Sequence, residues 1–402
     1  MKFKIPASAE KVIAELEKRG FEAYIVGGCV RDTLLKKEPN DWDVTTSALP
    51  EQTLEIFSAL DSFKAIPTGI THGTVTVVHG GVPIEVTTYR IDGEYSDSRH
   101  PDSVEFTDKL HADLARRDFT VNAMAYSPER GLVDLYGGVC DLENGIIRCV
   151  GDPHERFRED ALRILRALRF SATLDFMIED VTAKAAILLS GLLAHVSRER
   201  IASELSRLVC GKGASRVIRD FLPIIKGILP GVNFAGLDKI CTSLDNLFPA
   251  STPLGLAAIF ADCEPSDVHE SLRSLRFDSA TVSLCTAIVT HLHGNISTAA
   301  DVKRLCRDIG YGAAEDVIKL GIARGEMSSV LTDLLSGIIE RDECVSLAQL
   351  KIGGDELVSL GAKGREIGMI LSGLLEKVID GTLQNDKTPL LLEAVNIINR
   401  KG

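Results

Sequence analysis

The most informative stretch of this sequence is Ile25-Val-Gly-Gly-Cys-Val-Arg-Asp32, followed by Asn40-Asp-Trp-Asp-Val44. The apolar residues before the two glycines predict a short strand. Gly27 and Gly28 would let the backbone approach a phosphate closely, because glycine has no Cβ. Arg31 follows at the expected start of a helix. Gly28 and Arg31 are therefore candidate nucleotide-binding residues, and a purely structural turn is the alternative.

Asp41 and Asp43 are the candidate metal ligands. If this segment is a strand, alternate side chains point to one face, so the two carboxylates converge within reach of one metal ion. Oxygen-only ligands suit Mg²⁺, which also accepts oxygens from substrate phosphates. A solvated acidic turn is the alternative.

A third carboxylate, Glu85, lies on a predicted neighbouring strand. Strands are predicted at Thr74–His79 and Pro83–Tyr89, because both runs are rich in valine and threonine and alternate in polarity. Glu85 lies between two apolar residues, and we expect it to point inward, which is costly unless it is paired or metal-bound. Two aspartates on one strand and an acid on the next are the arrangement that two-metal phosphoryl transfer requires. Asp41, Asp43 and Glu85 are therefore the candidate catalytic residues.

Further nucleotide-binding candidates lie in Leu114-Ala-Arg-Arg-Asp-Phe-Thr-Val-Asn-Ala-Met-Ala-Tyr126. The spacing of Arg117, Asp118 and Asn122 allows them to share one surface at the start of a helix. Arg117 would meet a triphosphate, whereas Asp118 and Asn122 would hydrogen-bond a ribose hydroxyl. A salt-bridged surface helix is the alternative.

The rest of the chain divides into a mixed part and a helical part. Residues 8–19 predict an amphipathic helix, Gly131–Tyr136 predicts another strand, and the polar segment Asp92–Asp108 predicts a mobile loop. The first 147 residues therefore predict an α+β domain. After Pro153 the apolar residues follow helical periodicity to the end of the chain.

Four short motifs occur in order: Gly-Gly-x-Val-Arg-Asp, Asp-x-Asp, Arg-Arg-Asp-Phe-Thr-x-Asn-Ala-Met and Glu-Asp-x-x-Arg-x-x-Arg. In this order they resemble the bacterial (class II) tRNA nucleotidyltransferase and poly(A) polymerase family. The resemblance covers residues 20–210 and extends weakly to the glycine-rich tail between Ile352 and Gly368.

This resemblance implies a domain organisation. It implies an α+β nucleotidyltransferase head with a mixed β-sheet at residues 1–147, followed by all-α domains. These are a neck at 148–207 that carries base recognition, a body at 208–296 and a tail at 297–402, which hold the tRNA. It also implies that Asp134–Gly138 is a hinge between head and neck.

The neck motif suggests how a base is chosen without a template. Asp160 and Arg163 are three residues apart on a predicted helix, so they are surface neighbours. Asp accepts hydrogen bonds and Arg donates them, which matches the amino group and ring nitrogen that cytosine and adenine present side by side. Guanine and uracil present the opposite order. An ordinary salt bridge on the helix surface is the alternative. Arg166 and Arg169 continue along the helix as candidate phosphate contacts.

Composition limits the classes of protein that remain. The chain has 402 residues and a formal net charge of −12, so any grip on RNA must come from local basic strips such as Arg156–Arg169. Its nine cysteines include no C-x-x-C pair, which favours reduced thiols in a cytoplasmic protein. No apolar run is long enough for a membrane span, and no protein partner is evident.

The predicted function is template-independent addition and repair of the 3′-terminal CCA of tRNA. The substrates would be CTP, ATP and a tRNA lacking its CCA end, with Mg²⁺ as cofactor and pyrophosphate as product. The loop Ile91–Pro101 favours full CCA synthesis, because it resembles the flexible loop of relatives that add the terminal A. The absence of a His-Asp dipeptide indicates that the phosphohydrolase domain of some relatives is lacking.

Three alternatives remain open from the sequence. The first is a poly(A) polymerase or an A-adding-only enzyme of the same family. The second is a non-catalytic RNA-binding protein, against which the intact carboxylates argue. The third is a small-molecule nucleotidyltransferase, which would not need the long helical part of this chain.

Overall fold

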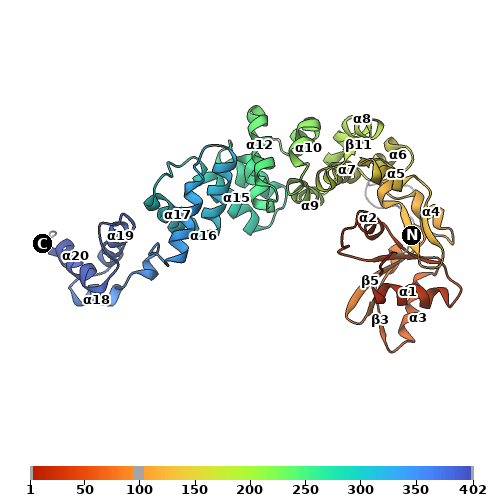
Figure 1. Ribbon diagram of the computed structural model, residues 1–402, viewed down its shortest axis with the longest axis horizontal. Helices are drawn as coiled ribbons and strands as arrows, with labels where there is room; N and C mark the ends of the chain where they lie inside the picture. The colour runs from red at the N-terminus through yellow and green to blue at the C-terminus, as the bar shows by residue number, and fades with distance from the viewer. Residues whose placement is uncertain (1–2, 94–103, 400–402) are drawn as a thin grey trace. The chain divides into compact units, whose positions relative to one another are not determined.

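The computed structural model describes residues 3–93 and 104–399. The chain forms two compact units, Met1–Leu229 and Pro230–Gly402. The first unit begins with a mixed region of strands and helices, and the described residues of the second unit form helices and turns (Figure 1). The predicted fold class, a mixed-sheet head followed by helical domains, is confirmed. The boundaries predicted after residues 147, 207 and 296 stay predictions.

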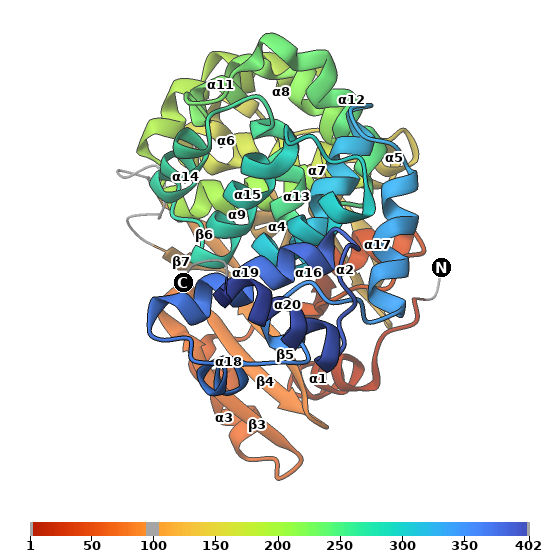
Figure 2. The same ribbon diagram turned by 90° about the vertical axis from the view of Figure 1, so that its left-hand side faces the viewer.

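A seven-stranded sheet in the order β3-β4-β5-β2-β1-β8-β9 is the framework of the head. Its strands are β1 (Ala23–Val26), β2 (Asp43–Thr46), β3 (Phe63–Gly69), β4 (Thr74–His79), β5 (Val82–Thr88), β8 (Met124–Ser127) and β9 (Gly131–Asp134). β2 and β5 run parallel and the other neighbours antiparallel, so the sheet is mixed as predicted. β3, β4 and β5 lie side by side in Figure 2.

Short helices surround this sheet. They are α1 (Ala7–Glu17), α2 (Gly28–Leu34), α3 (Pro50–Ser58), α4 (Leu110–Ala115) and α5 (Gly138–Glu143), with the 3₁₀ turns η1 (Ile70–His72) and η2 (Thr120–Asn122). α1 confirms the predicted amphipathic helix, because Val12, Ile13 and Leu16 lie on one face and are buried. The strand β1 is buried along its whole length, which explains its continuous apolar sequence.

The segment predicted as a loop at Asp92–Asp108 is partly a β-ribbon. β6 (Arg90–Asp92) pairs antiparallel with β7 (Val104–Phe106). The prediction of a loop over the whole segment was therefore wrong at its C-terminal end, where Val104 and Phe106 are partly buried. Residues 94–103, which include most of the loop that favours full CCA synthesis, lie outside the described residues.

The remainder of the first unit is mainly helical. It contains β10 (Ile146–Ile147), α6 (Pro153–Glu159), α7 (Leu162–Leu174), β11 (Met177–Ile178), α8 (Asp180–Leu188), η3 (Ser190–His195), α9 (Arg198–Val209), α10 (Ala214–Asp220) and α11 (Leu222–Ile228). α7 packs against α9 and buries Leu162, Leu165 and Leu168, as their spacing predicts. The neck is not purely helical, because β10 and β11 form a short parallel pair.

The second unit contains η4 (Phe234–Gly236), α12 (Leu237–Leu247), α13 (Thr252–Phe260), α14 (Pro265–Ser274), α15 (Ser279–Leu292), α16 (Ala299–Ala323), α17 (Val330–Glu340), η5 (Leu347–Gln349), α18 (Gly354–Ser359), α19 (Arg365–Ile379) and α20 (Lys387–Asn399). Its last three helices share an apolar core around Leu357, Leu374 and Leu390. Among the described residues, no helix combines the length and the apolar character that crossing a bilayer would require. All nine cysteines are free.

Candidate active site

Three carboxylates gather where β2 and β5 run parallel. Asp43, the first residue of β2, lies directly opposite Glu85 of β5, and Asp41 comes just before β2. We call Asp41, Asp43 and Glu85 the carboxylate end of the site. The prediction that an acid on the adjacent strand accompanies the two aspartates is confirmed. Asp41 itself lies outside the strand, since β2 begins at Asp43.

The inward orientation predicted for Glu85 was wrong. Ile84 and Val86 are buried and Glu85 is exposed. Successive side chains of a strand point to opposite faces, so the burial of both neighbours turns Glu85 away from the core. Glu85 nevertheless lies beside Asp43, because the two residues are paired across the strands.

The carboxylate end carries negative charge that the protein does not neutralise. In the part of the chain that the structure describes, none of its three carboxylates forms a hydrogen bond or an ion pair. Burial, together with the charges of Glu85 and Asp41, raises the pKa of Asp43 to about 6, against the opposing effect of Arg117. Uncompensated acids of this kind are an arrangement that a divalent cation would stabilise.

A cavity of about 420 Å³ extends from these acids into the neck. It is lined by Gly27, Gly28, Cys29, Arg31, Asp32, Asn40, Asp41, Asp43, Arg117, Asp118, Asn122, Arg166, Arg169, Phe170 and Arg207. The structure thus brings together most of the candidates from the sequence. Glu85, Asp160 and Arg163 are the candidates that do not line the cavity.

Gly27 forms the corner through which the backbone enters the cavity. Its φ of 78° favours glycine, and an added Cβ would lie 3.1 Å from a guanidinium nitrogen of Arg117. The next residue, Gly28, begins α2, which places Arg31 one turn further on. The predicted strand–turn–helix is therefore present, and its tight turn keeps the cavity open at this wall.

Asp118 is the centre of a buried hydrogen-bond network. Its Oδ2 accepts from Arg166 Nε at 2.8 Å, and its Oδ1 accepts from Asn122 Nδ2 at 3.1 Å. Asn122 Oδ1 in turn accepts from Arg31 Nη1 at 2.7 Å. Burial alone would raise the pKa of Asp118, but Arg166 and the hydrogen bond from Asn122 lower it to about 2. Asp118 is therefore an anion that holds the walls of the cavity together.

Arg166 and Arg169 are also neutralised from within the protein. Glu204 on α9 accepts from Arg169 Nε at 2.8 Å and lies 3.8 Å from Arg166 Nη1. The Arg169 guanidinium stacks 3.5 Å from the centre of the Phe170 ring. We call Arg166 and Arg169, with their partners Asp118 and Glu204, the arginine end of the site. Two acids of the chain thus balance its two cations, and the assignment of Arg166 and Arg169 as phosphate contacts stays a prediction.

The other two predicted cations of the cavity are paired as well. Arg31 Nη2 lies 2.8 Å from Asp32 Oδ1, and Arg117 Nη2 lies 3.1 Å from Asp113 Oδ2. Asp113 is fully buried, and the charges of Arg117 and Arg116 outweigh its burial and lower its pKa. Arg31 and Arg117 line the cavity, but acids of the chain share their charge.

Arg207 is a cavity residue that the sequence did not single out. It is exposed, and no acid pairs with it in the described part of the chain. It lies on α9, three residues after Glu204, so both reach the side of α7 that carries Arg166 and Arg169. The sequence shows it only as one more arginine of an amphipathic helix, because its neighbours on the cavity wall are distant in the chain.

The predicted helix surface that joins Asp160 to Arg163 is absent. Asp160 is extended and separates α6 from α7. Its carboxylate accepts from Leu162 N–H at 3.0 Å and from Arg200 Nη2 at 2.8 Å. Leu162 begins α7, so the Asp160 carboxylate satisfies the first amide of this helix from a position before its N-cap, Ala161.

Arg163 is buried in a separate set of contacts. It donates to Glu159 Oε2 at 2.6 Å and to the backbone carbonyl of Arg116 at 3.1 Å. The two residues proposed to read a base are therefore each held by a different partner. Their prediction as a base-reading pair stays a prediction.

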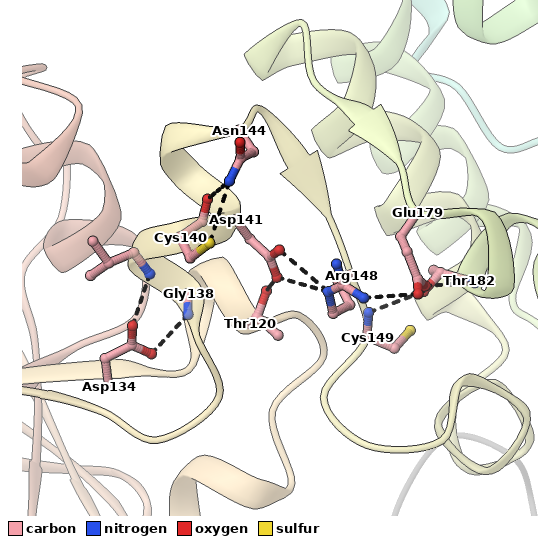
Figure 3. Close-up of polar contacts among 11 residues, drawn as sticks. Thr120, Asp134, Gly138, Cys140, Asp141, Asn144, Arg148, Cys149, Glu179 and Thr182 are labelled. Atoms are coloured by element: carbon pink, nitrogen blue, oxygen red, sulfur yellow. Dashed lines mark hydrogen bonds and ion pairs between the residues drawn. The ribbon is translucent and has the colours of Figure 1, made fainter.

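The segment between head and neck contains its own polar contacts (Figure 3). Asp134 accepts from Gly138 N–H at 2.8 Å and from Val139 N–H at 2.9 Å, and so closes the turn that precedes α5. This turn is the predicted hinge. It satisfies the first amides of α5 with a single side chain.

A chain of hydrogen bonds continues from this turn into the neck (Figure 3). Buried Asp141 accepts from Thr120 Oγ1 at 2.6 Å and from Arg148 Nε at 3.1 Å. Arg148 also donates to Glu179 Oε1 at 2.9 Å, and Glu179 accepts from Thr182 Oγ1 at 2.7 Å. Thr120 is two residues from Asp118, so these contacts link the cavity wall to α8.

Three parts of the chain match known family models. Residues 23–148 match the poly A polymerase head domain, and residues 175–222 match the probable RNA and SrmB-binding site of polymerase A. Residues 255–394 match a putative tRNA nucleotidyltransferase domain 2.

Individual relatives match along almost the whole chain. The CCA-adding enzyme of Lactobacillus delbrueckii subsp. bulgaricus is 35% identical over 95% of this chain and 96% of its own. The CCA-adding enzyme of Leuconostoc mesenteroides is 34% identical over 97% and 96%. The crystal structure of the Bacillus stearothermophilus CCA-adding enzyme in complex with CTP superimposes with a TM-score of 0.84 at 30% identity and covers 99% of both chains. The chain belongs to the family of CCA-adding enzymes.

Proposed function

We propose that this chain adds and repairs the 3′-terminal CCA of tRNA, using CTP and ATP and releasing pyrophosphate. The observation that carries this proposal is the full-length relationship to CCA-adding enzymes, combined with a carboxylate pair that opens into a nucleotide-sized cavity. The fold matches that of the CCA-adding enzyme solved in complex with CTP over almost the full length of both proteins. We also expect a cytoplasmic location, because all nine thiols are free.

Mg²⁺ is the metal that we assign to Asp41 and Asp43. Their oxygens are uncompensated, and the raised pKa of Asp43 reflects the unfavourable charge that a cation would relieve. No group of three or more His, Cys, Asp or Glu side chains in the described ranges could hold a metal alone. Two carboxylates supplemented by phosphate oxygens suit Mg²⁺, which commonly binds in this way. A metal held there would polarise the phosphate that is attacked.

The residues of the chain itself supply positioning. Gly27 and Gly28 leave room for the backbone to approach the nucleotide, and Arg31 and Arg117 lie on the wall near the acids. Asp118 and Asn122 hold these walls in place through their hydrogen bonds to Arg166 and Arg31. Contacts to a ribose would come from the side chains that they orient. Arg207 adds a positive charge that no acid of the described residues balances. We assign it a phosphate contact. Glu85 adds a third negative charge beside Asp43.

Base selection by Asp160 and Arg163 remains our hypothesis, and it needs a rearrangement. The side chains would have to leave Arg200 and Glu159 to present an acceptor and a donor to one base. Incoming cytosine or adenine offers replacement partners, whereas guanine or uracil would face like against like. Substitution of Arg200 by Ala should then alter discrimination among the four nucleoside triphosphates.

One assay tests the proposal against its alternatives. The protein is incubated with a tRNA that lacks its last three nucleotides, together with CTP and ATP, and product length is read on a gel. Addition of three nucleotides supports the proposal. A long adenosine tail would indicate a poly(A) polymerase, and one added A on a tRNA ending in CC, without C addition, would indicate an A-adding enzyme. No addition would favour a non-catalytic RNA-binding protein.

A further inference from the structure

The net negative charge of the unit Pro230–Gly402 opposes RNA binding. The unit contains more acidic than basic residues. Most of its lysines and arginines are also held in ion pairs, such as Lys303 with Glu343 at 2.6 Å and Arg324 with Glu326 at 3.0 Å. Phosphate binding depends on cations that are free to replace counterions. The sites that contact RNA should therefore be found at its unpaired cations.

Two unpaired cations of this unit share one cavity. Arg273 and Arg276 are exposed, and neither has an ion-pair or hydrogen-bond partner for its side chain in the described part of the chain. Both line a cavity of about 240 Å³ at the junction of α14 and α15. Three further cations of the unit have no partner among the described residues and do not line this cavity: Lys351, Lys363 and Arg365.

The fold directs several donors into the same space. His269 and Arg273 are four residues apart on α14, and Ser279 and Ser283 are four residues apart on α15, so each pair lies on one face of its helix. Arg276 lies in the turn between the two helices. The cavity is therefore lined by two guanidinium groups, an imidazole and two hydroxyl groups, without an acidic side chain.

Local backbone geometry places Arg276 at this wall. Its φ of 64° is in the left-handed region, where glycine or asparagine usually ends a helix. The turn is closed by hydrogen bonds from Arg276 N–H to Arg273 O at 3.0 Å and from Phe277 N–H to Leu272 O at 3.1 Å. An arginine in this conformation costs stability that glycine would not, which is consistent with a use for its side chain.

The acidic residue that precedes α15 is already engaged. Asp278 caps this helix and accepts from Thr281 N–H at 2.9 Å and from Thr281 Oγ1 at 2.7 Å. Asp267 and Glu270 on α14 do not line the cavity. The guanidinium groups of Arg273 and Arg276 thus line a space to which the described residues contribute no acidic side chain.

We propose that the cavity formed by His269, Arg273, Arg276 and Ser283 binds a backbone phosphate of the RNA substrate. Arginine presents a planar set of donors that matches phosphate oxygens. The volume is below that of typical sites for whole small molecules, so a single phosphodiester fits better than a complete nucleotide. Phe277 adds an apolar wall against which a ribose can pack. The identity of the ligand as RNA rests on the proposed function.

The test compares two double variants with the same loss of charge. R273Q/R276Q removes the cavity cations, and K319Q/R341Q removes two exposed cations of the same unit that are paired with Glu315 and Glu343. The affinity for tRNA lacking CCA is measured across a range of salt concentrations. We expect R273Q/R276Q to weaken binding roughly tenfold and to reduce the slope of log K against log salt by about 0.8, the change expected for one phosphate contact. K319Q/R341Q should match the wild type.

Further measurements separate the possible outcomes. R273K/R276K should recover most of the salt slope, because it retains the charges, and CTP incorporation at saturating tRNA should stay unchanged in all variants. Equal affinities and slopes for the two double variants, in a wild type that does add CCA, would overturn the site. If R273Q/R276Q loses binding of inorganic phosphate in calorimetry but keeps its tRNA affinity, the anion site stands and its assignment to RNA is overturned. A wild type that adds no nucleotides would instead refute the proposed function.

Discussion

The carboxylate end and the arginine end of the candidate active site differ in how their charges are balanced. At the carboxylate end, Asp41, Asp43 and Glu85 lie together without a cation that pairs with them in the described residues. At the arginine end, Arg166 and Arg169 are matched by buried acids. Charges that are paired within the protein stabilise its structure. Charges that have no partner within the protein indicate where a ligand of opposite charge can bind.

This difference gives the two ends different roles. We propose that the carboxylate end binds a metal that arrives with the nucleotide. The arginine end consists of ion pairs, in which removing one partner leaves a buried charge unpaired. Arg207 is the exception near the arginine end, because it lines the same cavity and has no acid partner among the described residues.

The largest expected effect follows from removing the carboxylate end. Replacing Asp43 by Ala should lower kcat on the order of a thousandfold, because a lost metal contact costs several kcal/mol in the transition state. The affinity for tRNA should change little. Single-turnover assays and a binding titration check both parts. Asp61→Ala, which removes an exposed acid outside the cavity, is the control. A Asp43→Ala protein with normal turnover would refute the catalytic assignment.

Disrupting the arginine end should instead reduce stability. Replacing Glu204 by Ala leaves Arg169 buried without its partner and should lower the free energy of unfolding by roughly 3–5 kcal/mol. Replacing Glu15 by Ala breaks an exposed pair with Arg19 and should cost only about 0.5 kcal/mol. Chemical denaturation of the three proteins measures both values. Equal losses in the two variants would show that the arginine end is no more structural than an exposed pair.

Substitution of Arg207 tests whether a cation of the neck without an acid partner binds phosphate. Replacing it by Gln should raise one Michaelis constant about tenfold, since a charge-assisted hydrogen bond contributes roughly 1.5 kcal/mol. Arg198→Gln makes the same charge change on the same helix, away from the cavity, and should have no effect. A raised KM for CTP would assign Arg207 to the triphosphate, and a raised KM for tRNA would assign it to the RNA. If both variants keep wild-type constants, Arg207 has no phosphate contact.

The smallest expected effect is a pH dependence without metal. Folding raises the pKa of Asp43 from 3.8 to about 6, so the folded state binds its proton more tightly than the unfolded state. This contribution stabilises the protein at low pH and is lost as the pH rises towards 6. Asp43→Asn should therefore be more stable than the wild type above pH 6 in the presence of a chelator, by about 1 kcal/mol after screening, and the difference should vanish below the unfolded pKa of 3.8. A difference that does not vary with pH would contradict the raised pKa.

Much of the site could be predicted because its motifs are local. Gly28, Arg31, Asp41 and Asp43 are close in the sequence, and the strand–turn–helix together with the neighbouring strand β2 places them around one cavity. The strand pairing that adds Glu85 could be inferred from its valine-rich run. Its orientation could have been inferred as well, because two buried neighbours on a strand require the residue between them to face the other way.

The partners in the neck could not be predicted from the same patterns. Arg200, Glu204 and Arg207 belong to α9, and their positions against α7 depend on how two helices pack. The break at Asp160 was missed because Glu159-Asp-Ala-Leu-Arg163 reads as a continuous helix by periodicity. In the structure, the Asp160 carboxylate accepts a hydrogen bond from the first amide of α7 instead. Side-chain partners set by tertiary packing leave little signal in a single sequence.

The assignment of the metal to the carboxylate end, and not to the arginine end, is tested most directly by calorimetry. Mg²⁺ is titrated into the nucleotide-free protein near pH 6, in buffers with different ionisation enthalpies. The wild type should bind Mg²⁺ and release part of a proton, because the metal displaces the proton that Asp43 retains at this pH. Glu204→Gln should behave in the same way. Asp41→Asn/Asp43→Asn should lose both the binding and the proton release. Wild-type Mg²⁺ affinity in that double variant would contradict the assignment of the carboxylate end as the metal site.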